Sequence, residues 1–312
     1  MTSIDVQPIR ADLGFGARIR GLTRDDLHDD AIRQQLVDVF EDRGVLVFDD
    51  VEPSPSMQVA ISTVFGPLKD HPSQATPRAG GELGVIEIRH EADAPGVVEI
   101  DGVRLSSWLP WHFDHCYNDK LNRAGVLRAV EIVPDGGRTG FVDGIALYEA
   151  VASEVLEQVE GREVLYAMDV IMDNLRYGRP PTLVEISPSE VAPAVMTEYA
   201  GRPRAIHPAV WTRATGEKVL HVSPWMAKGI VGLDDETADA LLHAIAEEIN
   251  DQAKGLCYFH QWQPGDMVIW DNWRILHSVS GSKPEYARCM HRTTIEGDYG
   301  LGRFEEIPAG QR

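Results

Sequence analysis

Apolar positions near the N-terminus recur with the period of a helix. In DDAIRQQLVDVFEDRG, residues 29–44, they stand three or four places apart, and Gly44 closes the pattern. This spacing predicts an amphipathic helix with a glycine stop. The apolar start of VLVFDD, residues 45–50, predicts a buried strand, and SPSMQVAISTVFG, residues 54–66, predicts a second helix.

The rest of the chain alternates between short strands and two long helical patterns. Helices are expected over 144–161 and over 234–251, where Asp234 or Asp235 is a plausible N-cap. Runs rich in β-branched and aromatic residues predict strands, at 84–90, 96–101, 125–133, 139–143, 257–263, 266–272 and 287–297. Strands at both ends of the chain, with helices between them, favour a sheet sandwich or barrel with helices packed outside.

Composition narrows the class of protein. No internal repeat or long linker interrupts the 312 residues, so we expect one domain over 1–312. The formal charge of -20 disfavours binding to nucleic acid or to an anionic membrane surface. The sequence shows no signal peptide, and its three cysteines lack metal-site spacing, so we expect a cytoplasmic protein that acts on a small molecule. The composition does not decide whether the protein forms a homo-oligomer.

Candidate metal ligands cluster in LPWHFDHCYN, residues 109–118. If this stretch is a strand, His112 and Asp114 point to the same face and can converge on one ion, whereas His115 points to the other face. A third ligand must then come from elsewhere. A His-x-Asp pair is weak by itself, because His28 and Asp30 make the same pair before the first helix, where capping or surface exposure is expected.

The C-terminal third offers the missing ligand. His277 follows WQPGDMVIWDNWRIL, a turn and a buried strand, and Arg288 and Arg292 lie on the next strand with their side chains toward the same interior. Two histidines and one carboxylate are the protein ligands of non-haem Fe(II) oxygenases and leave positions for a 2-oxo acid and dioxygen. A guanidinium suits the far carboxylate of that acid.

Three separated blocks resemble the taurine dioxygenase-like (TauD/TfdA) family of Fe(II)/2-oxoglutarate-dependent oxygenases. They are WHFDHCY, PDGGRTGFVDGIALYEAV and WQPGDMVIWDN with the histidine and arginines behind it. The resemblance spans nearly the whole chain and implies a mainly β protein with flanking helices and a double-stranded β-helix (jelly-roll) core. It implies Fe(II), with 2-oxoglutarate and O2 as co-substrates. His112, Asp114 and His277 would be the iron ligands, and Thr139 and Arg288 would bind the distal carboxylate of 2-oxoglutarate.

The same resemblance suggests the substrate side of the site. Arg292 and His71 match positions that hold the substrate's anionic group in taurine-type members, and Trp108 and Tyr117 match pocket positions. Trp225 lies in HVSPWMAKG, which departs from the family's usual pattern and makes the pocket more aromatic. The expected reaction is hydroxylation, or cleavage following hydroxylation, of an anionic and partly apolar substrate, with release of succinate and CO2.

Two other readings stay open at this point. PWHFDH fits the HxHxDH motif of metallo-β-lactamase-like hydrolases except that Pro110 stands in place of the first histidine. A jelly roll without catalytic activity is the other alternative, because fold does not imply function. Within the oxygenase reading, the carboxylate of Asp114 argues against a halogenase, which keeps that coordination position for halide. The segment 91–110 is expected to be an extra loop or hairpin beside the site.

Overall fold

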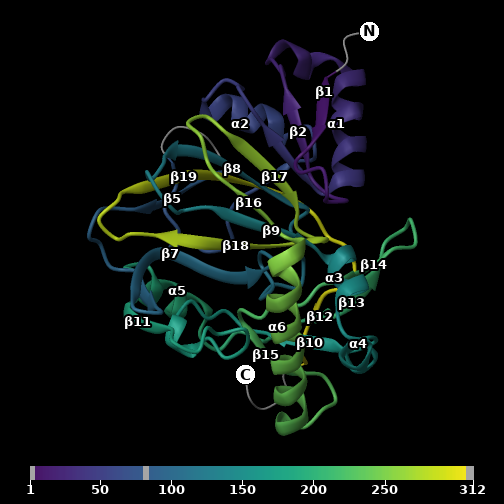
Figure 1. Ribbon diagram of the computed structural model, residues 1–312, viewed down its shortest axis with the longest axis vertical. Coiled ribbons are helices and arrows are strands. Elements are labelled where there is room, and N and C mark those ends of the chain that lie inside the picture. The colour runs from purple at the N-terminus through teal and green to yellow at the C-terminus, as the bar shows by residue number, and fades with distance from the viewer. Residues whose placement is uncertain (1–3, 80–83, 307–312) are drawn as a thin grey trace.

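Two antiparallel sheets face one another in the computed structural model, which describes residues 4–79 and 84–306 (Figure 1). Within these ranges the larger sheet has the order β1-β2-β3-β17-β8-β19-β4, with β5 also paired to β19, and only β2 and β3 run parallel. Its strands are β1 (Asp5–Pro8), β2 (Ala17–Arg20), β3 (Val45–Phe48), β4 (Leu68–Lys69), β5 (Val85–His90), β8 (Ala124–Glu131), β17 (Met267–Asp271) and β19 (Arg288–Ile295).

The second sheet has the order β11-β6-β7-β18-β9-β16. Its strands are β6 (Val97–Ile100), β7 (Val103–His112), β9 (Thr139–Asp143), β11 (Val184–Ser187), β16 (Tyr258–His260) and β18 (Ile275–Ser282). Phe141 and Ile275 of this sheet pack with Trp270 and Met290 of the larger sheet, so an apolar core fills the space between them. Strands from distant parts of the chain therefore close around one interior, as the sequence predicted.

Helices cover the outside of the sheets (Figure 1). α1 (Asp30–Arg43) and α2 (Pro55–Ser62) pack on the outer face of the larger sheet through a core that includes Leu36 and Met57. The remaining elements are η1 (Asp25–His28), α3 (Gly144–Ala150), α4 (Ser153–Val159), β10 (Glu163–Tyr166), η2 (Met172–Asn174), α5 (Ala192–Tyr199), β12 (Ala205–Pro208), β13 (Val210–Thr212), β14 (Lys218–Leu220), β15 (Ala227–Ile230), α6 (Asp235–Leu256) and β20 (Arg303–Phe304). Among the described residues, no helix combines the length and the apolar character needed to cross a bilayer.

Local chemistry explains where the helices begin and end. Gly44 takes a φ of 70° directly after α1, so the predicted glycine stop is confirmed. Asp234 caps α6, since its side chain accepts a hydrogen bond from the backbone N–H of Thr237. The single helix expected over 144–161 is wrong: α3 ends before Val151, whose backbone is extended, and α4 is a separate helix. α2 also ends at Ser62, earlier than expected.

The segment 91–110 forms a hairpin that leads directly to the candidate metal ligands. β6 and β7 pair in register, with Ile100 opposite Val103, around a tight turn in which Asp101 and Gly102 have φ of 53° and 75°. Positive φ at both central residues is the geometry that Asp-Gly favours in two-residue hairpin turns. β7 then continues to His112, so the hairpin and the metal cluster share one strand.

Candidate active site

Three buried side chains converge at the ends of β7 and β18. His277 lies opposite His112 in the antiparallel register of these strands, and their ring centroids are 4.0 Å apart. Asp114 follows two residues after β7, with Oδ1 3.7 Å from Nε2 of His277. One ligand atom from each of the three residues lies within 4.8 Å of the others. Their geometry suits a single metal ion held by two imidazoles and one carboxylate.

The strand does not continue through this cluster as expected. β7 ends at His112, and Asp114 lies in a turn in which His115 has a φ of 57°. The convergence of His112 and Asp114 therefore comes from a strand end and a turn rather than from the alternation of a strand. His115 was expected to point to the opposite face only if the strand continued through it. The strand ends before His115, so that condition is not met.

Both histidines are in the neutral state that a metal requires. Nδ1 of His112 lies 2.8 Å from the carbonyl oxygen of Pro110, so Nδ1 carries the proton and Nε2 keeps its lone pair for a metal. Burial lowers the pKa of His112 and of His277. Nδ1 of His277 has no hydrogen-bond partner among the described residues. These features fit a divalent cation of the Fe(II) type.

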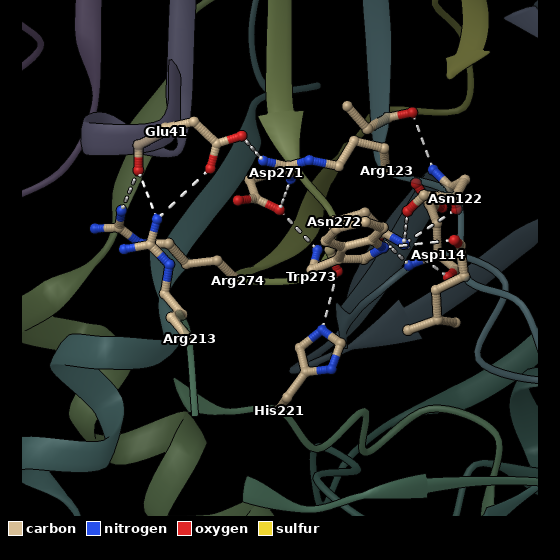
Figure 2. Close-up of polar contacts among 12 residues, drawn as sticks. Glu41, Asp114, Asn122, Arg123, Arg213, His221, Asp271, Asn272, Trp273 and Arg274 are labelled. Carbon is tan, nitrogen blue, oxygen red and sulfur yellow. Dashed lines mark hydrogen bonds and ion pairs between the residues drawn. The ribbon is translucent and has the colours of Figure 1, made fainter. Parts of the chain in front are cut away.

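Asp114 is held from two sides. Arg292 donates from Nη1 and Nη2 to its two carboxylate oxygens, at 3.0 and 2.6 Å. Burial by itself would raise the pKa of Asp114, but Arg292 and the neighbouring histidines hold it below its usual range. Behind the turn, the side chain of Asn272 accepts from the backbone N–H of Asp114 at 2.7 Å and donates to its carbonyl oxygen and to Asn122, both at 3.0 Å (Figure 2). Asp114 is therefore ionised and fixed in position.

Arg288 shares the interior face of β19 with Arg292 but has different surroundings. Its guanidinium is buried and, within the part of the chain that the structure describes, makes one hydrogen bond, from Nη2 to the carbonyl oxygen of Gly137 at 3.3 Å. Among the described residues it has no carboxylate partner, and burial lowers its pKa to about 10. A side chain at Gly137 would meet Val133 at 2.8 Å, so the close approach of this loop requires glycine. A buried guanidinium of this kind is suited to an anionic ligand.

Thr139 lies in the same interior as Arg288. Its hydroxyl oxygen accepts a hydrogen bond from Nε1 of Trp262 at 3.1 Å. The hydroxyl proton is therefore available to donate to a ligand. Thr139 and Arg288 together offer hydroxyl and guanidinium donors to the same cavity.

A cavity of about 400 Å³ connects the two arginines and the metal cluster. The sequence-predicted residues that line it are His71, His112, Asp114, Tyr117, Thr139, Trp225, His277, Arg288 and Arg292. Trp108 is not among its lining residues. The reason is an irregularity in β7: His277 is opposite His112, but Val279 is opposite Leu109, so one extra residue in β7 reverses the alternation. Leu109 lines the cavity in place of Trp108.

His115 is a cavity residue that sequence reasoning placed in a packing role. It is buried, lines the cavity, and neither ring nitrogen has a hydrogen-bond partner among the described residues. Its ring lies edge-on to His71, with centroids 5.4 Å apart. Burial lowers the pKa of His71 to about 4, and the backbone N–H of Ser73 donates to its Nδ1. The two neutral imidazoles form one wall beside Arg292.

A second group of metal-ligand residue types lies on the opposite face of β19. Glu87, Cys289 and His291 have ligand atoms within 4.8 Å of one another. Arg128 donates to Nδ1 of His291 at 2.8 Å, which leaves the proton on Nε2, the nitrogen that faces Glu87. The imidazole therefore presents no lone pair to this group, and the cluster does not suit a metal.

Facing sheets with a His-Asp-His cluster between them give a jelly-roll protein with a candidate metal site, and comparisons with known proteins specify its family. Residues 5–294 match the family described as taurine catabolism dioxygenase TauD, TfdA family. The chain belongs to this family. Membership makes it an α-ketoglutarate-dependent dioxygenase, an oxidoreductase, and implies Fe(II), 2-oxoglutarate and O2. This confirms the family and enzyme class expected from the sequence and disfavours the metal-hydrolase alternative.

Curated relatives resemble the chain over most of its length. The (S)-phenoxypropionate/alpha-ketoglutarate-dioxygenase of Sphingobium herbicidovorans is 28% identical over 95% of this chain and 96% of its own. The alpha-ketoglutarate-dependent 2,4-dichlorophenoxyacetate dioxygenase of Cupriavidus pinatubonensis is 27% identical over 85% and 88%. Pentalenolactone F synthase of Streptomyces avermitilis is 24% identical over 89% and 90%. These relatives act on different small molecules, as their names state.

Solved structures confirm the fold. A taurine dioxygenase from Burkholderia xenovorans superposes with a TM-score of 0.70 at 23% identity, over 98% of this chain and 97% of that one. AAD-2, crystallised with Mn(II) and N-oxalylglycine, superposes with a TM-score of 0.69 at 20% identity, over 95% and 98%. The jelly-roll core expected from the sequence is therefore confirmed.

Proposed function

We propose that this dioxygenase hydroxylates a C–H bond of a small organic anion that carries an apolar or aromatic group. The observation that carries the proposal is the neutral His112, neutral His277 and ionised Asp114 around one point, beside Arg288, which has no carboxylate partner among the described residues. In the overall reaction, 2-oxoglutarate loses CO2 and becomes succinate. One oxygen atom of O2 enters succinate and the other enters the new hydroxyl group. Hydroxylation next to a heteroatom would lead to bond cleavage.

The proposed roles follow the chemistry of each side chain. His112, Asp114 and His277 would hold Fe(II), which when bound supplies the activation of O2. Arg288 and Thr139 would bind the distal carboxylate of 2-oxoglutarate, because within the described ranges the guanidinium has no carboxylate partner and the hydroxyl can still donate a hydrogen bond. Asn272 positions Asp114 through its backbone. This arrangement would keep the co-substrate at a fixed orientation toward the metal.

The substrate side is proposed to lie around Arg292. Nε of Arg292 has no partner among the described residues, and His71 and His115 flank it with neutral rings. These groups would bind the anionic end of the substrate, while Tyr117 and Trp225 provide apolar walls. Two relatives are named for aromatic carboxylates, phenoxypropionate and 2,4-dichlorophenoxyacetate, and we propose the same class of substrate for this chain.

The test is Asp114→Ala, which removes a metal ligand and leaves Arg292 unpaired. We expect at least about a thousandfold loss of Fe(II)-dependent succinate formation from 2-oxoglutarate, together with loss of bound iron. Asp114→Asn, which keeps the shape of the side chain, controls for misfolding and should lose iron as well. Asp30→Ala is the matched control, because it alters the other His-x-Asp pair at an exposed position. Full succinate formation by Asp114→Ala would overturn the assignment.

A further inference from the structure

A second cavity, of about 230 Å³, adjoins the first. We call it the annex. Leu109, Val195 and Trp225 line both cavities, so the annex lies directly beside the candidate active site. Its other walls come from the hairpin at Val98 and from α5 at Ala192. The segment around β6 and β7 therefore builds a compartment beside the metal cluster.

The annex differs chemically from the main cavity. Glu185 is the one ionisable residue among its described lining residues, and its carboxylate accepts a hydrogen bond from the backbone N–H of Asp173. Neither Arg288 nor Arg292 lines it. Its lining is dominated by apolar side chains such as Met172 and Trp108. An anionic group would lose its hydration there without gaining a cationic partner, whereas an apolar group would gain from burial.

Trp225 lies at the boundary between the two compartments. Its ring meets the ring of His112 edge-on, with centroids 5.0 Å apart at 90°. Arg292, in contrast, contacts Asp114. A molecule with its charged end at Arg292 and its apolar end past Trp225 would thus extend across the candidate metal ligands.

We propose that the annex binds the apolar end of the substrate, so that the substrate is an amphiphilic anion with a ring-sized or larger apolar group. This inference rests on the proposed function, because it assumes that the anionic end lies at Arg292. The size supports it, since a dry cavity of about 150 Å³ is large enough to hold benzene. The annex exceeds that volume. The proposal also gives Trp108 a place in substrate binding, through the annex rather than the main cavity.

The test compares two probes with the same head, propionate and 3-phenylpropionate, added to the anaerobic protein with Fe(II) and 2-oxoglutarate. Calorimetry measures their binding. Burial of one phenyl ring should make 3-phenylpropionate bind at least about tenfold more tightly. Succinate release on admitting air measures whether the bound probe supports turnover. Binding and turnover are thereby read separately.

Two substitutions on β11 form a matched pair. Ser187 lines the annex, whereas Ile186, the preceding residue, is 44% exposed and does not line it. Ser187→Trp should remove the preference for 3-phenylpropionate and change propionate binding by less than about twofold. Ile186→Trp should leave both affinities unchanged. If Ser187→Trp fails to fold, Ser189→Trp at an exposed position is the second variant. Because Ser189 lines both cavities, this variant is judged by the ratio of the two probe affinities, which should fall toward one.

The outcomes separate this inference from the proposed function. Equal binding of the two probes by the unaltered protein, or equal effects of Ser187→Trp and Ile186→Trp, would overturn the annex proposal even if 2-oxoglutarate is consumed. Failure to bind Fe(II) and 2-oxoglutarate would overturn the proposed function instead. In that case the calorimetric difference between the probes still tests the annex.

Discussion

Arg288 and Arg292 reach into the same cavity from one strand, yet the two regions around them differ. Arg292 is paired through both Nη atoms with the carboxylate of Asp114. Arg288 is equally buried but has a single carbonyl partner, and its pKa is lowered to about 10. A buried charged side chain that is paired with an opposite charge fixes the position of its partner. A buried charged side chain without such a partner lowers the free energy of unfolding, and a ligand of opposite charge restores that free energy on binding. In the proposed function, Arg288 binds only the co-substrate. Arg292 both positions Asp114 and binds the anionic end of the substrate through Nε, which has no partner among the described residues.

The largest expected effect comes from Arg292→Gln. It leaves the buried carboxylate of Asp114 uncompensated and should lower the free energy of unfolding by about 3–5 kcal/mol. Urea unfolding of the metal-free protein measures this. Arg20→Gln, which alters an ion pair whose arginine is 52% exposed, is the control and should leave the midpoint unchanged. If the Arg292→Gln variant were as stable as the unaltered protein, Arg292 and Arg288 would not differ in their contribution to stability.

Arg288→Gln should act in the opposite direction on the metal-free protein. Because it removes a buried guanidinium without a carboxylate partner, unfolding should require about 1–2 kcal/mol more free energy. Affinity for 2-oxoglutarate should fall about a hundredfold, since a buried charge pair with the ligand is lost. Calorimetry under anaerobic conditions measures that affinity.

Arg288→Lys sharpens the same prediction. It keeps a point charge but loses the planar fork, so its affinity for 2-oxoglutarate should lie between those of Arg288→Gln and the unaltered protein. A loss of stability in Arg288→Gln, with unchanged 2-oxoglutarate affinity, would show that the guanidinium is structural.

Asn272→Ala tests how Asp114 is positioned without touching either arginine. It removes two hydrogen bonds to the backbone of Asp114, which are buried, and should weaken Fe(II) binding about tenfold. Asn250→Ala is the matched control, because its side chain donates to Gly178 away from the cluster. Equal Fe(II) affinities in the two variants would mean that the turn is held by other contacts.

Local periodicity and the family blocks predicted the fold and much of the candidate site. The interior faces of Arg288 and Arg292 follow from the alternation of one regular strand, and β19 is that strand. Local patterns also predicted α1, α2, α6 and several strands of the facing sheets, but not the break between α3 and α4 or the elements from β10 to β15. That His277 belongs to the same site as His112 came from the resemblance, and their pairing on neighbouring strands was not predicted at all.

The positions of two residues were not predicted from the sequence, for a common physical reason. Trp108 was expected in the substrate pocket, but the irregularity in β7 takes it out of the lining of the main cavity, and it lines the annex. His115 was expected to face away, but the strand ends before it and its backbone turns into the left-handed region. Both residues lie where the alternation of side chains along β7 is interrupted. The periodicity of a single sequence does not show where such an interruption falls. The annex escaped as well, because its walls come from β6, β7, η2, β11 and α5, far apart in the chain.

The central claim is that His112, Asp114 and His277 hold Fe(II) while Arg288 orients 2-oxoglutarate upon it. Its most direct test is the visible absorption of the anaerobic protein on adding Fe(II) and then 2-oxoglutarate. A weak charge-transfer band should develop with 2-oxoglutarate, be absent in Asp114→Ala, and require about a hundredfold more 2-oxoglutarate in Arg288→Gln. No band at saturating Fe(II) and 2-oxoglutarate, or an equal band in Asp114→Ala, would contradict the account.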